Sequence, residues 1–141
     1  MLHWVKKKEI QQPAGIEIKQ SPVHGLGVFA CQFIKPGAVI ETAPVILMEQ
    51  PDKDFLQTTM LFSYYFVVGD KKFPVALGLG YSSLYNHSYH ANAEYSISLK
   101  GSYIKIKACK TINPGEEIML NYNGSPDDTS PVYFATEEST I

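Results

Sequence analysis

The sequence predicts a mainly β domain, and three observations support this prediction. Short runs of β-branched and aromatic residues recur along the chain, and turns rich in proline and glycine separate them. Tyrosine and phenylalanine, which favour strands, occur nine and seven times, whereas helix signals are weak. The length of 141 residues suits one compact domain, and a hydrophobic content of 45% is sufficient for its core.

The first half of the chain contains three candidate strand segments. Residues 16–19 alternate apolar and polar side chains, and residues 28–30 form an apolar run after a glycine turn. Residues 39–48 form one or two strands, because Pro44 cannot donate a hydrogen bond and interrupts the apolar run.

Two hairpins are expected further along the chain. Residues 62–68 read as a strand that pairs with residues 73–77 across a polar turn containing Gly69. Residues 95–99 and 103–107 flank a second short turn with a central glycine. Both pairs therefore predict antiparallel ribbons.

Helix is expected in two short places only. Residues 51–59 could form a helix with Asp52 as its N-cap, and residues 82–86 could form one helical turn. The tail after residue 124 is expected to be a loop that docks back on the body through the apolar residues 131–134. The last residues, 135–141, are expected to fray.

One short pattern occurs twice. Residues 34–40 resemble residues 112–118, and each copy carries a Pro-Gly pair before an apolar strand. Proline and glycine suit the two central positions of a type II turn, where glycine supplies the positive φ. We interpret the pattern as one turn chemistry used twice.

Composition and charge narrow the function classes. The formal net charge is -2, and Lys6-Lys7-Lys8 is the only strong basic run, which we interpret as a solvated tail. Direct nucleic-acid binding is therefore not expected. The start of the chain lacks the apolar core of a signal peptide, and no run is long enough to span a bilayer. We expect a cytoplasmic or nuclear protein.

The cysteines do not predict a metal site. Cys31 and Cys109 lie far apart, and no Cys-x-x-Cys pair exists, so a structural zinc ion is not expected. We expect two reduced, buried thiols, although a single disulfide would also fit the count.

Three segments carry candidate chemistry. In the first, His24-Gly25-Leu26-Gly27, two glycines let the backbone approach a ligand closely and present its N–H groups. The segment lacks the third glycine and the strand–helix setting of a dinucleotide-binding fold. Most such glycine pairs are only turns, so this segment alone predicts little.

The second segment, residues 86–92, is dense in hydrogen-bonding side chains, with Asn86, His87 and His90 among them. A metal site built on the two histidines would need a third ligand, and the sequence offers no clear one. A serine catalytic triad would need a nucleophile elbow, and no Gly-x-Ser-x-Gly pattern is present. Taken alone, the segment could be a polar loop that satisfies its own backbone.

The third segment, residues 115–123, runs from a Pro-Gly turn through two acids and an apolar strand to Tyr122. Taken alone, Tyr122 could be a half-buried strand residue, which is common in any β protein.

Taken in order, the three segments resemble the SET-domain family of protein-lysine methyltransferases. The family shows Gly-x-Gly near its start, Asn-His-Ser-Cys-x-Pro-Asn past its middle and Gly-Glu-Glu-Leu-x-x-x-Tyr near its end. Here they stand as Gly25-Leu26-Gly27, residues 86–92 and residues 115–122, and the resemblance covers about residues 16–134. It implies a β-clip-like fold of several small sheets with short helices, and a C-terminal segment threaded under an earlier loop as a pseudoknot.

The sequence departs from the family pattern at several positions, and none of these departures removes a residue that is assigned to the chemistry. Tyr89 stands where the family has cysteine, Ala91 where it has proline, and Asn121 where an acid often precedes the tyrosine. Ser83 stands where the family often has an arginine that contacts the cofactor. No cysteine follows Tyr122, so the zinc-binding post-SET module is absent from this sequence.

The resemblance implies S-adenosylmethionine as the cofactor and no metal. It implies that the backbone of residues 24–27, that is His24, Gly25, Leu26 and Gly27, holds the methionine end, and that Asn86 and His87 hold the amino group and the adenine. Tyr122 would orient the amine. Tyr133 or Phe134 would cover the adenine or close the lysine channel, although simple core packing fits them equally well.

The resemblance also implies a channel for the lysine side chain, lined by tyrosines. The candidates are Tyr64, Tyr65, Tyr81 and Tyr122, and Tyr64 and Tyr65 are rivals for one position because strand faces alternate. The implied partner is a protein or peptide that carries a lysine, such as a histone, and compact viral members suggest a homodimer.

The whole chain, residues 1–141, would form a single SET domain with a core at about residues 16–124 and a docking tail at residues 125–141. Two alternatives stay open. The chain could be a SET fold that binds peptide or cofactor without turnover, or it could methylate a small molecule or another side chain.

Overall fold

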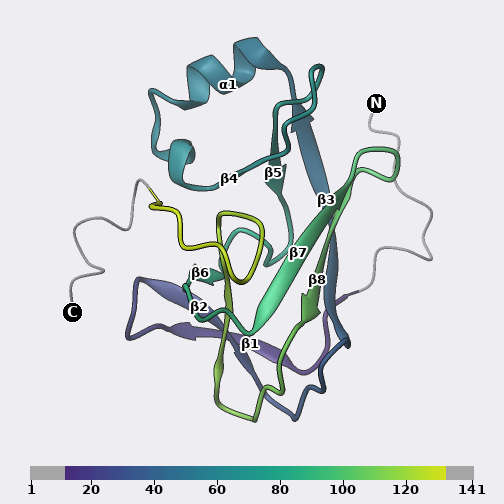
Figure 1. The fold of residues 1–141 in the computed structure, drawn as a ribbon, viewed down its shortest axis with the longest axis vertical. Coiled ribbons are helices and arrows are strands. Elements are labelled where there is room, and N and C mark those ends of the chain that lie inside the picture. Colours follow the sequence, from purple (N-terminus) through teal and green to yellow (C-terminus); the bar gives the residue numbers. More distant parts are fainter. Residues whose placement is uncertain (1–11, 133–141) are drawn as a thin grey trace.

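The computed structural model describes residues 12–132 of the chain. Strands dominate these residues (Figure 1), and one α-helix and one short 3-10 helix follow each other between the third and fourth strands. The predictions for Lys6-Lys7-Lys8, Tyr133, Phe134 and residues 135–141 lie outside the described residues. The elements in chain order are β1 (Ile16–Gln20), β2 (Leu26–Ala30), β3 (Val39–Met48), α1 (Gln50–Leu56), η1 (Met60–Ser63), β4 (Tyr65–Val67), β5 (Val75–Gly78), β6 (Asn86–His87), β7 (Ala93–Ser98), β8 (Tyr103–Ala108) and β9 (Glu117–Leu120).

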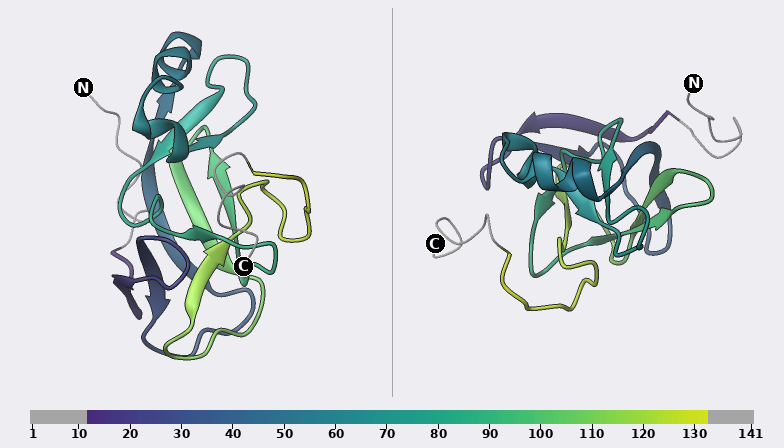
Figure 2. Two further views of the ribbon diagram at one scale, coloured as in Figure 1. Left: turned by 90° about the vertical axis from the view of Figure 1, so that its left-hand side faces the viewer. Right: turned by 90° about the horizontal axis from the view of Figure 1, so that it is seen from above.

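The strands are linked in the spatial order β1-β2-β9-β7-β8-β3-β5-β4, and β6 pairs with β9 beside this path. The helices α1 and η1 lie at one end of the molecule with β4 and β5, and β1 and β2 lie at the opposite end (Figures 1 and 2). The predicted mainly β class is confirmed.

Strand β9 is the element that brings distant segments together. It is antiparallel to β2, with Val28 opposite Ile118, and it runs parallel to both β6 and β7. A parallel pair needs a long connection, and here the β7–β8 hairpin lies between β6 and β9 in the chain. The second and third candidate segments of the sequence therefore end up as neighbours.

Both predicted hairpins are confirmed. Strand β4 pairs antiparallel with β5, and β7 pairs antiparallel with β8. Asp70 stabilises the first turn, because its carboxylate accepts hydrogen bonds from the backbone N–H groups of Lys72 and Phe73 at 2.9 and 3.0 Å.

The expected interruption at Pro44 does not divide the strand, and β3 runs on through this residue. The physical reason is that β3 changes its partner here. Residues up to Pro44 pair with β8, and residues from Val45 pair with β5. The missing N–H of Pro44 falls at this change, and its carbonyl accepts the Leu79 N–H at 2.9 Å.

The predicted strand at residues 62–68 is wrong in its first part, where the 3-10 helix η1 replaces it and only residues 65–67 are extended. The Thr59 side chain accepts the Leu61 N–H at 3.2 Å and so starts this helix.

The predicted helices also need correction. The observed helix α1 begins with Glu49 as its N-cap, and Asp52 instead accepts the Glu49 N–H at 3.2 Å as the reciprocal half of a capping box. The expected helical turn at residues 82–86 is wrong: a turn ends at residue 83, and residues 86–87 form β6.

The repeated Pro-Gly pattern has a structural consequence. Gly37 and Gly115 have φ values of 86° and 87°, as the type II turn requires. Ile34 and Ile112, at the start of the two copies, pair with each other in an antiparallel bridge with N–H···O distances of 2.8 and 2.9 Å. The two similar turns therefore stand side by side.

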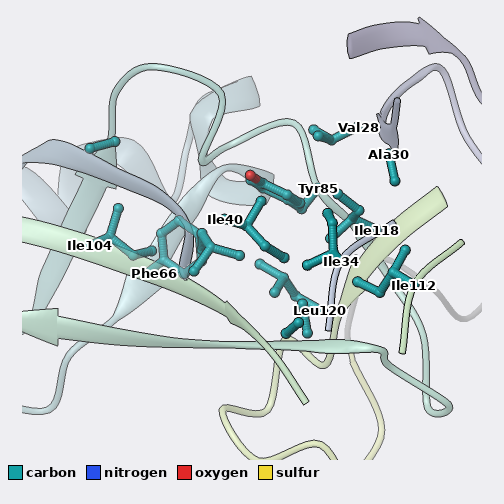
Figure 3. Packing of buried hydrophobic residues seen from close by; sticks show 14 of the residues in the cluster. Val28, Ala30, Ile34, Ile40, Phe66, Tyr85, Ile104, Ile112, Ile118 and Leu120 are labelled. Carbon is teal, nitrogen blue, oxygen red and sulfur yellow. The ribbon is translucent and has the colours of Figure 1, made fainter. Parts of the chain in front are cut away.

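The core lies between the strands, and aliphatic side chains dominate it (Figure 3). Its fully buried members include Val28, Ile104, Ile106, Ile118 and Leu120, and the ring of Tyr85 lies among them. The expectation of two buried thiols is wrong for Cys31, which is exposed, whereas Cys109 is partly buried; both are free.

Candidate active site

The candidate site forms where β6 meets the end of β9. Asn86 pairs with Met119 and His87 with Leu120, so the chain leaving β9 passes directly beside the Asn86-His87 segment. Tyr122 follows two residues after β9. Its hydroxyl donates to the Tyr85 carbonyl at 2.6 Å, and its N–H donates to His87 Nδ1 at 3.1 Å. The second and third candidate segments therefore meet around one phenol.

The Tyr122 hydroxyl is held in its neutral form. Burial raises the pKa of Tyr122 above its ordinary value, and the charges of Tyr64 and Glu117 add to this increase. A phenol with a raised pKa is a poor general base near neutral pH. Since its one proton is donated to the Tyr85 carbonyl, the oxygen can interact with any further polar group only as an acceptor.

His87 is also neutral. Its Nδ1 accepts the Tyr122 N–H, and burial lowers the pKa of the imidazole. The proton then resides on Nε2, a buried atom without a hydrogen-bond partner among the described residues. The ring packs edge-on against Tyr89, at 4.5 Å between centroids, and lies tilted at 5.2 Å from Tyr122.

The neutral His87 predicts a specific pH dependence of stability. Because the pKa of His87 is lower in the folded than in the unfolded chain, the unfolded chain binds more protons below about pH 6.5. The His87 contribution is complete above that pH and is lost as the pH falls. The free energy of unfolding, measured by urea denaturation at pH 7.5 and 5.5, should therefore decrease toward pH 5.5.

His87→Asn is the matched variant for this measurement, because the Asn oxygen can accept the same N–H near the place of Nδ1. Its decrease between pH 7.5 and 5.5 should be smaller than that of the natural protein. Glu41, whose pKa burial raises, is present in both proteins and cancels in the comparison. Equal decreases in the two proteins would contradict a neutral, buried His87.

Asn86 connects the second segment to the glycine segment. Its side chain is buried, and Nδ2 contacts three acceptors: the His24 carbonyl at 3.1 Å, the Leu26 carbonyl at 3.1 Å and Glu117 Oε1 at 2.7 Å. The carbonyls of the glycine segment thus point at Asn86, which fixes the shape of this turn. All three candidate segments meet here.

Glu117 is a site residue that sequence reasoning did not single out. Its second oxygen, Oε2, accepts the Ser21 hydroxyl at 2.8 Å, while Oε1 accepts Asn86. The carboxylate therefore joins β9 to Ser21, which precedes the glycine segment, and to Asn86 in β6. The only available signal was its place in the Gly115-Glu116-Glu117 run, and nothing local told it apart from Glu116, which is exposed.

The two glycines of the first segment are required for different structural reasons. Gly25 has φ +48°, and the space where a side chain would stand is open within 4 Å, so the backbone is accessible there. At Gly27, a Cβ would meet the Glu117 carboxylate and would lie 3.1 Å from Asn86 Nδ2. The position of Gly25 leaves room for a ligand, and the missing side chain of Gly27 leaves room for the contact between Glu117 and Asn86.

Removal of the Asn86 amide is expected to loosen the glycine segment. Asn86→Ala leaves two carbonyls and a carboxylate without their donor, at a cost of about 1–3 kcal/mol in the free energy of unfolding. Thermal and urea unfolding measure this loss. Asn113→Ala, an exposed turn residue bonded to Glu116, is the matched control and should change stability by less than about 0.5 kcal/mol. Equal losses in both variants would contradict the anchoring role.

A cavity of about 480 Å³ opens beside Tyr122. Aromatic rings dominate its described lining, and Lys53 is the one charged residue among the described lining residues. The described lining consists of Lys53, Gln57, Phe62, Ser63, Tyr64, Tyr65, Phe66, Val67, Ser82, Ser83, Tyr85, Tyr95, Tyr122, Asn123, Pro131 and Val132. Such a lining suits an extended, mostly apolar chain that carries a polar tip.

The structure places the predicted channel residues as follows. Tyr64, Tyr65 and Tyr122 line the cavity, and Tyr81 is not among its described lining residues. Tyr64 and Tyr65 both reach it because Tyr64 is the C-cap that follows η1 while Tyr65 begins β4, so strict strand alternation does not separate them. Tyr81 is partly exposed on the turn before β6.

Sequence reasoning missed Tyr85 and Tyr95 as cavity residues. The Tyr95 hydroxyl donates to the Tyr122 carbonyl at 3.4 Å, and its ring packs at 4.9 Å from Phe66. Tyr95 lies on β7 and Phe66 on β4, and no local signal relates these strands. Tyr85 stood directly before Asn86 in the candidate segment, so its position was visible although its role was not.

The tail after β9 returns to the site. The Asn121 side chain donates to the Asp128 carbonyl at 2.6 Å, Asn123 donates to the Ser130 carbonyl at 2.6 Å, and Val132 is buried. Residues 131–132 thus form part of the cavity lining. Within residues 12–132, no group of three or more His, Cys, Asp or Glu side chains could hold a metal ion.

Comparison with known proteins agrees with this geometry. The family model described as the SET domain matches residues 25–123. The chain belongs to the SET-domain family. The expected family fold is confirmed by a solved structure from Plasmodium falciparum, assigned as a histone methyltransferase, which has a TM-score of 0.65 and 30% identity and covers 82% of this chain and 97% of its own.

Two further SET-family matches differ in what they show. A Schizosaccharomyces pombe protein, described as a histone-lysine N-methyltransferase specific for H3 lysine-37, is 32% identical over 108 residues, which are 76% of this chain and 72% of that protein. A structure of apo ctPRC2 with substitutions in Ezh2 has a TM-score of 0.65 at 22% identity, covers 78% of this chain and 15% of that one, and shows the SET fold alone.

No helix among residues 12–132 is long and apolar enough to cross a membrane.

Proposed function

We propose that this SET-domain protein is an S-adenosylmethionine-dependent protein-lysine N-methyltransferase. The observation that carries the proposal is the position of Tyr122: it lines the aromatic cavity, its N–H donates to His87, and its hydroxyl donates to the Tyr85 carbonyl directly before Asn86. A cofactor held on one side and a lysine side chain entering from the other would meet at this oxygen. The SET-family relatives, one described as a histone-lysine N-methyltransferase and one as a histone methyltransferase, support this assignment.

The reaction needs a neutral amine more than it needs a strong base. A free lysine has a pKa of about 10.4, so its neutral form costs roughly 4–5 kcal/mol at pH 7. The cavity is aromatic, and Tyr64, Tyr65, Tyr95 and Tyr122 would surround the lysine stem. Low polarity disfavours an ammonium ion and lowers its pKa. The lining therefore contributes to deprotonation of the substrate.

Tyr122 would orient the amine. Because its proton is donated to the Tyr85 carbonyl, its lone pairs can accept a hydrogen bond from the incoming nitrogen. Its raised pKa favours the protonated phenol near neutral pH, which supports an orienting role over that of a general base. Positioning of this kind aligns the nitrogen for in-line attack and is a large part of the catalysis of a simple displacement.

The residues around the glycine segment fit the cofactor. The open space at Gly25 admits the methionine end against backbone groups, and Asn86 holds that turn in shape. The His24 to Gly27 backbone, Asn86 and His87 would hold the cofactor, and Tyr133 and Phe134, which lie beyond the described residues, are proposed to cover it. When bound, the cofactor supplies an activated methyl group on a positively charged sulfur.

The substrate is proposed to be a lysine-bearing protein, and histones are the first candidates because the relatives are described by that activity. Assay with S-adenosylmethionine labelled in its methyl group, on histones and on a host-cell extract, tests the proposal. Label in a protein band, located on lysine by mass spectrometry, is the expected result. Label on free amines alone would instead support a small-molecule methyltransferase.

A measurement of cofactor binding distinguishes the proposed enzyme from a SET fold without catalytic activity. Calorimetry that detects binding while no substrate accepts label would support a SET fold that binds without turnover. The same material in sedimentation experiments measures the oligomeric state, for which a homodimer is proposed from the resemblance to compact members of the family.

A further inference from the structure

Glu41 is a buried carboxylate in the middle of strand β3, and only 2% of it is exposed. It follows Ile40 in an apolar run. Each of its oxygens accepts one hydrogen bond: Oε1 from the Tyr85 hydroxyl at 2.9 Å and Oε2 from the Tyr81 N–H at 2.9 Å. Both donors belong to the turn that precedes β6, so one side chain holds this turn at two points.

The turn is shaped around the carboxylate. Gly80 has φ +63°, and a Cβ there would lie 2.7 Å from Glu41 Oε2, so the chain passes directly over the acid. Ser82 closes the turn through a 2.7 Å hydrogen bond to the Leu79 carbonyl, and the Leu84 N–H donates to the Tyr81 carbonyl at 2.9 Å. The conformation of residues 79–85 thus depends on Glu41.

This turn ends at Tyr85, whose carbonyl orients the hydroxyl of Tyr122. The Tyr85 ring is anchored at its hydroxyl by Glu41, while the Tyr85 carbonyl accepts the Tyr122 hydroxyl at 2.6 Å. Figure 3 shows the Tyr85 ring among the aliphatic side chains of the core, so neither end of this residue can shift independently of the other. A contact chain therefore runs from Glu41 through Tyr85 to Tyr122.

We propose that Glu41 is a positioning residue for methyl transfer, which acts through Tyr85 to aim the Tyr122 hydroxyl at the incoming amine. Stability alone does not account for it, because a buried carboxylate costs free energy that well-packed apolar residues would not. Its two hydrogen bonds instead fix the place of one backbone carbonyl. A displacement of about 1 Å in such a group can cost roughly 100-fold in rate.

The inference rests on the proposed function, and its test is a comparison of three variants with the natural protein. Glu41→Gln keeps the size but leaves one of the two donors without an oxygen acceptor, and Tyr85→Phe removes only the hydroxyl contact. Glu94→Gln, at an exposed ion pair with Lys107, is the matched control. The measurements are kcat and KM for a lysine-bearing peptide that the natural protein methylates, the cofactor Kd from calorimetry, and the midpoint temperature of thermal unfolding.

Glu41→Gln and Tyr85→Phe should each lower kcat about 10- to 100-fold, while KM and the cofactor Kd change less than about threefold. Glu94→Gln should leave all of these values unchanged. Glu41→Gln added to Tyr122→Phe should cause no further loss of rate, because its effect passes through the missing hydroxyl. A merely structural role of Glu41 would lower the rate in both backgrounds equally.

Two results would overturn the inference: a normal kcat in a folded Glu41→Gln or Tyr85→Phe protein, or additive losses in the combined variant. If Glu41→Gln does not fold, Tyr85→Phe decides alone. The failure of the proposed function looks different, because then the natural protein itself transfers no methyl group, and the inference falls with it.

Discussion

Replacement of Tyr122 by phenylalanine is expected to lower the rate of methyl transfer by about 100-fold or more while cofactor binding persists. The ring and its contact with His87 remain, so the site keeps its shape. The lost hydroxyl is the group that would orient the amine, and its hydrogen bond to the Tyr85 carbonyl holds it in place. The effect should therefore appear in the chemical step.

Single-turnover measurements with labelled cofactor give this rate directly, and calorimetry with S-adenosylhomocysteine gives the binding constant. Tyr103→Phe is the matched control, since Tyr103 lies on β8 and is not among the described cavity residues. It should retain the natural rate within about twofold, as expected of a substitution away from the site. A Tyr122→Phe protein as active as the natural one would remove Tyr122 from the mechanism.

Replacement of Gly27 by alanine is expected to weaken cofactor binding. The added methyl group would meet the Glu117 carboxylate and press on the Asn86 amide, and these two groups hold the glycine segment. Overpacking of this kind costs about 1–3 kcal/mol. If that cost falls on the cofactor-binding conformation, it raises the cofactor Kd roughly 5- to 150-fold.

Calorimetric titration and urea denaturation together measure the effect, because the first reports binding and the second reports folding. Gly69→Asn is the control, since Gly69 also has a positive φ, of +78°, but no atom stands within 4 Å of its added Cβ. Asparagine tolerates this conformation, so binding should be unchanged. Tight cofactor binding by Gly27→Ala would show that the Glu117 anchor is not needed.

The local patterns predicted the strands well and the helices less well. The two hairpins were found because turn residues separate runs of β-forming residues, which is a short-range signal. Pro44 was over-interpreted because its effect depends on which strand is the partner at that point. Residues 60–63 became η1 because the Thr59 cap outweighed the strand propensity of an apolar run.

The candidate site was predicted in its motifs and not in its connections. The three segments could be ordered along the chain, but their meeting depends on β9 lying between β2 and β7 and beside β6. Glu41 and Glu117 illustrate the limit. Each is a single acid in a strand, and only packing shows that one holds Tyr85 and the other holds Asn86.

By itself, the sequence determined a mainly β domain, its two hairpins and the three segments that place it in the SET-domain family, because turn chemistry and motif spacing are written in neighbouring residues. Only the tertiary structure decided that Tyr122 donates to Tyr85, that both Tyr64 and Tyr65 reach the cavity, and that the carboxylates of Glu41 and Glu117 hold the site. The physical reason is that these contacts join residues 31 to 96 positions apart, and strand pairing over such distances leaves no local trace.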